Sequence, residues 1–294
     1  MAEGNTLRPR SSSLTSATLT SAAEMEGACQ ACVADLGQDS LMMPSSSSQN
    51  AVPNIFLQPF DCIKSVSDYV KAGEEKFCVA SAIFSPSEIF LVHATHFPKK
   101  VDSFIWCMSD VYNSVIKGPH RNEWLVNYRL VRNGMFVAVY KREENEWHRG
   151  QVLYESSSNP ERRMFMVQFI DFGDREEIWE GDLAYLHKNF AHQLGWSIRC
   201  RLELGKYYDR YHKGTLMWPP ALKKNLHDTL FDKRFRVKFL RKVIQYGYEV
   251  WEVSLLNFRD AHPMNVVNQP IQKQVILRML EKYVEDDGTE ITEF

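Results

Sequence analysis

Residues 223–242 are rich in basic residues, and three aromatic residues follow shortly after this stretch. The basic residues are Lys223, Lys224, Lys233, Arg234, Arg236, Lys238, Arg241 and Lys242, and the aromatic ones are Tyr246, Tyr248 and Trp251. Basic side chains hold the phosphates of single-stranded nucleic acid, and aromatic rings stack on its bases. Lys238, Arg241 and Lys242 are therefore candidate RNA contacts. The alternative is a solvated helix face and a strand edge protected from pairing.

A second stretch, residues 171–182, is acidic, and Arg175 is its single basic residue. Its acidic residues are Asp171, Asp174, Glu176, Glu177, Glu180 and Asp182, and an upstream turn adds Glu143, Glu144 and Glu146. Such a run is usually a solvated face. It would also speed the encounter with a basic peptide, because complementary charge steers association.

Motifs for catalysis and metal binding are missing from the sequence. It contains no P-loop, GxSxG or HExxH pattern, and no cluster of acidic calcium ligands with arginines as a nuclease would need. Cys29 and Cys32 form a lone CxxC, whereas a structural zinc site needs four ligands. We therefore expect a protein that is not an enzyme and that binds no metal or other cofactor.

Composition indicates a soluble intracellular protein. The chain has 294 residues, 44% of them hydrophobic, which is enough for a sizeable core, and its formal net charge is −2. Six scattered cysteines indicate a reducing compartment. No apolar run resembles a secretory signal or approaches the length of a membrane helix.

The flanks of the chain contain strand, helix and tail signals. Residues 1–55 are rich in Ser and poor in large apolar residues, which predicts a disordered tail. Runs 77–83 and 88–94, separated by Ser85-Pro86-Ser87, predict a β-hairpin. Apolar residues at three- and four-residue steps then predict a helix over about 98–117.

Residues 134–186 contain closely spaced short strands and tight turns, which favour a curled sheet that closes into a small barrel. Beyond it we expect a strand, a helix, two strands and a C-terminal helix, at 196–204, 219–230, 235–243, 248–255 and 271–285. Neither flank has enough core alone. We therefore expect residues 75–130 and 195–270 to form one second barrel into which the central unit, residues 131–190, is inserted.

Three motifs of the central unit resemble the signature of the Tudor family. Phe136–Tyr140, Glu146–Val152 and Val167–Asp174 are similar to the family patterns A-x-[YF], W-Y-R-A-x-V and V-x-F-I-D-Y-G-N. The flanks resemble the staphylococcal-nuclease-like half of an extended Tudor module, so that the resemblance covers about residues 75–270. It implies a mainly β fold with helices, in which a five-strand SH3-like barrel is inserted into a split OB-type barrel.

The resemblance also implies a function. Extended Tudor domains are non-catalytic readers of methylated arginine, chiefly symmetric dimethylarginine in Arg/Gly-rich tails of PIWI-type Argonaute proteins. They serve as scaffolds in piRNA-guided transposon silencing. Such a protein would be cytoplasmic and could gather in perinuclear germline granules, the nuage.

Methylarginine chemistry fits an aromatic cage. A methylated guanidinium keeps its charge but loses hydrogen-bond donors, and ring faces attract a poorly hydrated cation. By the family match, the cage residues are Tyr140, His148, Phe169, Phe172 and Asp174. His148 stands where the family usually has Tyr, and it can charge near pH 6.5 and repel a cation. Asp174 stands where the family usually has Asn, and it adds a negative charge.

Other interpretations of these residues stay open. Each ring could instead pack in the core, since a strand places alternate residues inside. The two departures also permit a degraded cage, in a scaffold that binds partners independently of methylation. Arg149 and Asp171, at matched family positions on adjacent strands, are expected to form a structural pair that holds the bend before Phe172.

Salt dependence tests the RNA interpretation. If the basic stretch binds RNA, the affinity should fall steeply with salt, because each phosphate contact releases counterions. Replacing Lys238, Arg241 and Lys242 with alanine should weaken RNA binding and leave peptide binding unchanged. Binding of a single-stranded RNA that does not respond to salt, or its absence at low salt, would remove the hypothesis.

Overall fold

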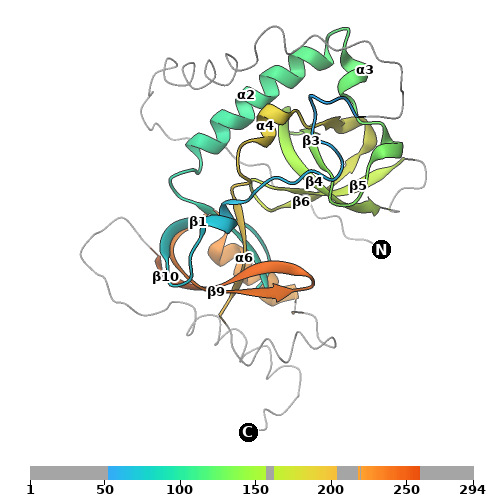
Figure 1. The fold of residues 1–294 in the computed structure, drawn as a ribbon. Coiled ribbons are helices and arrows are strands. Elements are labelled where there is room, and N and C mark those ends of the chain that lie inside the picture. Colours follow the sequence, from blue (N-terminus) through green and yellow to red (C-terminus); the bar gives the residue numbers. More distant parts are fainter. Residues whose placement is uncertain (1–51, 157–161, 204–217, 219, 259–294) are drawn as a thin grey trace.

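The computed structural model describes residues 52–156, 162–203, 218 and 220–258, which form two lobes (Figure 1). Most of the expected tail and the whole of the expected helix over 271–285 lie outside the described residues. We call the two lobes the flank barrel and the central sheet.

The flank barrel is a closed sheet with the strand order β1-β2-β8-β10-β9. Its strands are β1 (Glu75–Ser85), β2 (Glu88–His93), β8 (Ser197–Leu202), β9 (Arg234–Gln245) and β10 (Tyr248–Phe258). Neighbouring strands are antiparallel except for β8 and β10, which are parallel. Strands from both sides of the central segment therefore pair in one barrel, which confirms the predicted fold class.

Turn chemistry and one helix complete this barrel. Tyr246 and Gly247, both with positive φ angles, make the tight turn between β9 and β10. Helix α6 (Pro220–Leu230) packs on β1 and buries Leu226 and Leu230 in the core of the barrel. The side chain of Trp251 packs in the same core.

The central sheet has five strands in the order β6-β5-β4-β3-β7. They are β3 (Phe136–Lys141), β4 (Glu146–Ser156), β5 (Met164–Phe169), β6 (Arg175–Trp179) and β7 (Leu183–Tyr185). The short 3-10 helix η4 (Glu180–Asp182) leads from β6 to β7. All pairings are antiparallel.

Helix α2 (Lys99–Ile116) packs on the central sheet, although it lies in the segment assigned to the flank barrel (Figure 1). Tyr112 donates a hydrogen bond of 2.8 Å to the carbonyl of Tyr185. Ser109 accepts one of 2.7 Å from the backbone of Trp147, and Asn113 accepts one of 3.0 Å from its indole. The sheet thus supplies partners for these polar groups of the helix, as burial requires.

Several short helices connect these elements. They are η2 (Val66–Tyr69), α3 (Arg121–Trp124), η3 (Tyr128–Leu130) and α4 (Lys188–Ala191). Ser65 caps η2 by accepting from Ser67. Trp124 of α3 lies under α2, where its ring meets that of Tyr112 edge to face at 5.0 Å.

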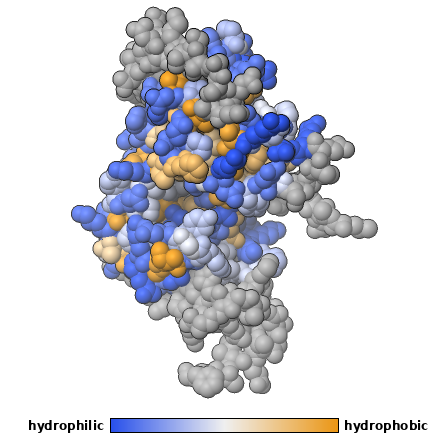
Figure 2. Space-filling view, turned by 45° about the vertical axis from the view of Figure 1, so that its right-hand side comes forward, coloured by the Kyte–Doolittle hydropathy of each residue, from blue (hydrophilic) through white to orange (hydrophobic). Residues whose placement is uncertain are grey.

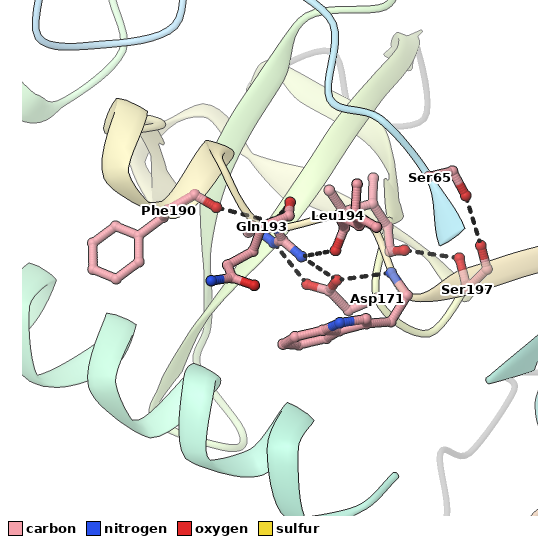
Figure 3. Close-up of polar contacts among 9 residues, drawn as sticks. Ser65, Asp171, Phe190, Gln193, Leu194 and Ser197 are labelled. Atoms are coloured by element: carbon pink, nitrogen blue, oxygen red, sulfur yellow. Dashed lines mark hydrogen bonds and ion pairs between the residues drawn. The ribbon is translucent and has the colours of Figure 1, made fainter. Parts of the chain in front are cut away.

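Arg149 and Asp171 form a buried bidentate salt bridge, with Nε–Oδ2 at 3.0 Å and Nη2–Oδ1 at 2.5 Å. The same guanidinium donates to the carbonyls of Phe190, Gln193 and Leu194 at 2.6–2.9 Å (Figure 3). Both side chains are at most 3% exposed. All three nitrogens of this arginine therefore have acceptors, which a buried charge requires.

The bend after β5 also joins the two lobes. Ser81 of β1 donates a 2.5 Å hydrogen bond to the carbonyl of Phe172. Gly173 has a φ of +90°, and a Cβ there would lie 2.1 Å from Cγ of Phe90. Glycine is needed at this position both for its backbone angle and for the contact with β2.

Stability measurements test how much the buried Arg149–Asp171 pair contributes to the free energy of unfolding. Arg149→Met should lower the free energy of unfolding by about 3–5 kcal/mol, because Asp171 would be left as an uncompensated buried charge. Arg142→Met, which removes an ion pair of a 59% exposed side chain with Asp182, should lower it by less than about 1 kcal/mol. Urea unfolding measures both, and similar losses would contradict the assignment.

Candidate functional site

Three of the five expected cage residues bring their rings together. His148 and Phe169 lie on one face of the sheet, because Phe169 pairs with Gly150, two residues after His148. Their ring centroids are 5.6 Å apart, and those of His148 and Phe172 are 5.9 Å apart. The three residues are 3%, 1% and 6% exposed, so the rings are packed together rather than open to solvent.

Tyr140 lies on the opposite face of the sheet. It pairs with Trp147 in the register of β3 and β4, whereas His148 pairs with Val139. The ring of Tyr140 is 5.3 Å from that of Trp147, and its hydroxyl donates to Asn145 at 2.5 Å. The structure does not bring Tyr140 into contact with the three rings.

Lys141, rather than Tyr140, lies on the face of the sheet that carries the three rings. Its Nζ lies over the ring of Phe169, 4.8 Å from the centroid. Three carboxylates surround the ammonium, Glu144 at 2.9 Å, Glu176 at 3.0 Å and Asp174 at 3.8 Å. We call the four residues that surround this ammonium, Glu144, Phe169, Asp174 and Glu176, the cation site.

The electrostatics of the cation site keep Lys141 charged. Burial alone would lower the pKa of Lys141, whose side chain is 12% exposed, but the carboxylates of Asp174, Glu144 and Glu176 outweigh it and raise the pKa. Burial raises the pKa of Asp174, against the attraction of Lys141. Within the described residues, the Oδ1 atom of Asp174 is buried without a hydrogen-bond partner. This oxygen is an unused acceptor at the edge of the site.

His148 faces a negative environment. Its Nε2 lies 3.2 Å from Glu144 and 3.6 Å from Glu146. Burial lowers the pKa of His148, but these carboxylates outweigh it and the net shift is upward, while the pKa of Glu144 falls to about 2 through its contact with His148. The stability that His148 contributes is full below its unfolded pKa of about 6.5 and is lost as the pH rises through the folded pKa.

Glu144, Glu146 and His148 place ligand atoms within 4.8 Å of one another, which is close enough to hold a metal ion. The ammonium of Lys141 lies 2.9 Å from the Glu144 carboxylate and competes for it. The arrangement already neutralises these carboxylates with side chains of the protein.

The candidate RNA residues lie on β9 among acidic neighbours. Arg241 contacts Glu252 at 2.9 Å, and Lys242 contacts Glu249 at 2.8 Å. Lys238 pairs in register with Glu75 of β1. RNA binding therefore stays a prediction, since at least part of this charge is engaged within the barrel.

The aromatic residues near β9 divide into buried and exposed ones. Trp251 is buried and cannot stack on a base, whereas Tyr246 and Tyr248 are exposed. On the face drawn in Figure 2, hydrophobic residues emerge among hydrophilic ones in both lobes. Among the described residues, no helix has the length and apolar character of a membrane span.

Sequence comparison matches residues 70–204 to the Tudor domain family. The Drosophila melanogaster Tudor and KH domain-containing protein homolog is 25% identical over 132 residues, which are 44% of this chain and 22% of the relative. The aligned region therefore spans about a fifth of that relative's length.

Two solved extended Tudor domains share the fold. The human TDRD1 domain, solved with a symmetrically dimethylated peptide, has a TM-score of 0.52 and 17% identity, covering 67% of this chain and 85% of that one. A mutant Papi domain from Drosophila melanogaster, solved with a symmetrically dimethylated Piwi N-terminal peptide, has a TM-score of 0.52 and 18% identity, covering 66% and 94%. It was also solved with the unmethylated form of that peptide. Residues 70–204 therefore match the Tudor domain family, and the described residues adopt the fold of extended Tudor domains.

Proposed function

We propose that this chain is a non-catalytic reader of symmetrically dimethylated arginine in Arg/Gly-rich segments. The observation that supports this most directly is the ring face of Phe169, which holds a cation 4.8 Å from its centroid among three carboxylates. A methylated guanidinium is a flat, weakly hydrated cation, so it suits the same ring face and the same negative surroundings.

The proposed cage consists of His148, Phe169, Phe172 and Asp174. Among the first three, His148 lies within 6 Å of each of the other two rings, at 5.6 and 5.9 Å. Dimethylarginine retains some N–H groups, and the unused Oδ1 atom of Asp174 could accept a hydrogen bond from one of them. Tyr140 is left out of the cage because its ring lies on the other face of the sheet.

The proposed partner is a PIWI-type protein with a methylated Arg/Gly-rich tail. A dimethylated Piwi peptide appears in a complex of the related Papi domain, and another dimethylated peptide appears in that of TDRD1. The acidic residues around the cage complement a basic tail and would speed its encounter. The corresponding role is a scaffold in piRNA-guided silencing, in the cytoplasm or in perinuclear germline granules.

A second candidate function is a scaffold that binds partners independently of methylation. The observation that favours it is the close packing of His148, Phe169 and Phe172, none of which is more than 6% exposed. A ring that is already covered offers little face to a guest. The two candidates differ in whether methylation of the peptide changes its affinity.

Peptide titration distinguishes the two candidates. A symmetrically dimethylated Arg/Gly peptide should bind the full chain more tightly than its unmodified counterpart. Phe172→Leu removes a ring but keeps most of the volume, and it should lower affinity for the methylated peptide more than tenfold, about 1.4 kcal/mol. This size is consistent with a desolvated cation–π contact of roughly 2 kcal/mol.

Tyr140→Leu is the matched control, since Tyr140 lies nearby on the opposite face. We expect it to change the affinity by less than about threefold, a difference well under 1.4 kcal/mol. Calorimetry of both variants, with thermal melting to verify folding, checks the assignment. Equal affinity of the wild-type protein for methylated and unmodified peptides would favour the scaffold that ignores methylation.

A further inference from the structure

We infer that Lys141 is an intramolecular occupant of the cation site, and that a guest cation binds only when Lys141 leaves it. This inference rests on the proposed function. Lys141 lies where a guest would lie, over the Phe169 ring and between Glu144 and Glu176. Its ammonium therefore competes with the ligand within the same molecule.

Simultaneous occupancy by two cations is excluded by distance and charge. The ring of Phe169 is packed against His148, and Lys141 lies 4.8 Å from its centroid. A guanidinium over the same ring would therefore approach the ammonium closely. Two like charges at such a distance repel strongly, because a partly buried site screens them far less than bulk water does.

Exchange of one cation for another preserves the charge of the site. The carboxylates of Glu144, Asp174 and Glu176 contact the ammonium, and they would lose this neutralising charge if Lys141 left without a replacement. An empty site is therefore the unfavourable state. Departure of Lys141 and arrival of a guest are coupled steps.

The position of Lys141 in the fold allows it to leave. It is the last residue of β3, and the four residues that follow, 142–145, form an exposed turn. The flexible four-carbon stem of lysine can carry the ammonium from the ring into solvent with the strand in place. Besides the contact of Glu144 with Lys141, the turn is held by contacts between Arg142 and Asp182 and between Tyr140 and Asn145.

An internal competitor lowers the affinity of every guest by the fraction of time that the site is free of it. It also selects among guests. A guanidinium is more weakly hydrated than an ammonium and spreads its charge over a plane, so it displaces Lys141 more readily than a peptide lysine does. Lys141 would thus favour arginine-derived ligands over lysine-derived ones.

Peptide titrations of Lys141→Ala test the inference. The variant should bind the symmetrically dimethylated Arg/Gly peptide about tenfold more tightly than the wild-type chain, because the competitor is gone. Arg142→Ala removes the neighbouring cation, which contacts Asp182 outside the cation site, and should bind like wild type. Unchanged or weaker binding by a folded Lys141→Ala chain would overturn the inference.

A second measurement does not depend on the peptide. N,N′-dimethylguanidinium should raise the melting temperature of Lys141→Ala more than that of wild type or Arg142→Ala, because it refills the vacated site. Equal shifts in all three chains would overturn the inference. If neither chain binds the peptide but this selective shift occurs, the proposed function fails and the occupancy by Lys141 stands.

Labelling of the wild-type chain covers the case in which Lys141→Ala does not fold. With limiting acetic anhydride, Lys141 should be acetylated much more slowly than the exposed Lys99 and Lys100, as measured by peptide mass spectrometry. Dimethylguanidinium should accelerate the labelling of Lys141 alone. Rapid labelling of Lys141 without guanidinium would overturn the inference.

Discussion

The guanidinium of Arg149 connects three parts of the chain through one buried charge. It extends from β4 to the carboxylate of Asp171 in the bend after β5, and to the carbonyls of Phe190, Gln193 and Leu194 before β8. Because a buried charge needs all of its acceptors, moving any of these segments away would leave the guanidinium short of a partner. This requirement holds the bend that carries Phe172, and with it the ring cluster.

The same bend makes the proposed cage dependent on both lobes. Ser81 and Phe90 of the flank barrel contact Phe172 and Gly173 directly. Helix α2 covers the opposite face of the sheet through its contacts with Trp147. The central sheet supplies the rings, but residues outside it also hold their positions, so the proposed cage requires the whole extended module.

Strand periods, turns and the Arg149–Asp171 pair were accessible from the sequence, because each depends on local pattern or on a specific motif. The face of Tyr140 was not. Whether Tyr140 or Lys141 shares a face with His148 depends on the register across the turn at 142–145, and motif spacing does not determine that register. The sheet on which α2 packs could not be predicted from the sequence either, since an apolar helix face does not specify which sheet it covers.

The insertion of the central sheet has a consequence for synthesis of the chain on the ribosome. The β1–β2 hairpin is complete at residue 93, yet its neighbours in the barrel begin at residues 197 and 234. The apolar face of this hairpin therefore stays uncovered during elongation until those strands are made. Strands β3 to β7, in contrast, follow one another and can pair as they emerge. Contacts of long sequence separation form slowly. We therefore expect the β1–β2 hairpin of the nascent chain to need protection from aggregation until β8 and β9 have been made.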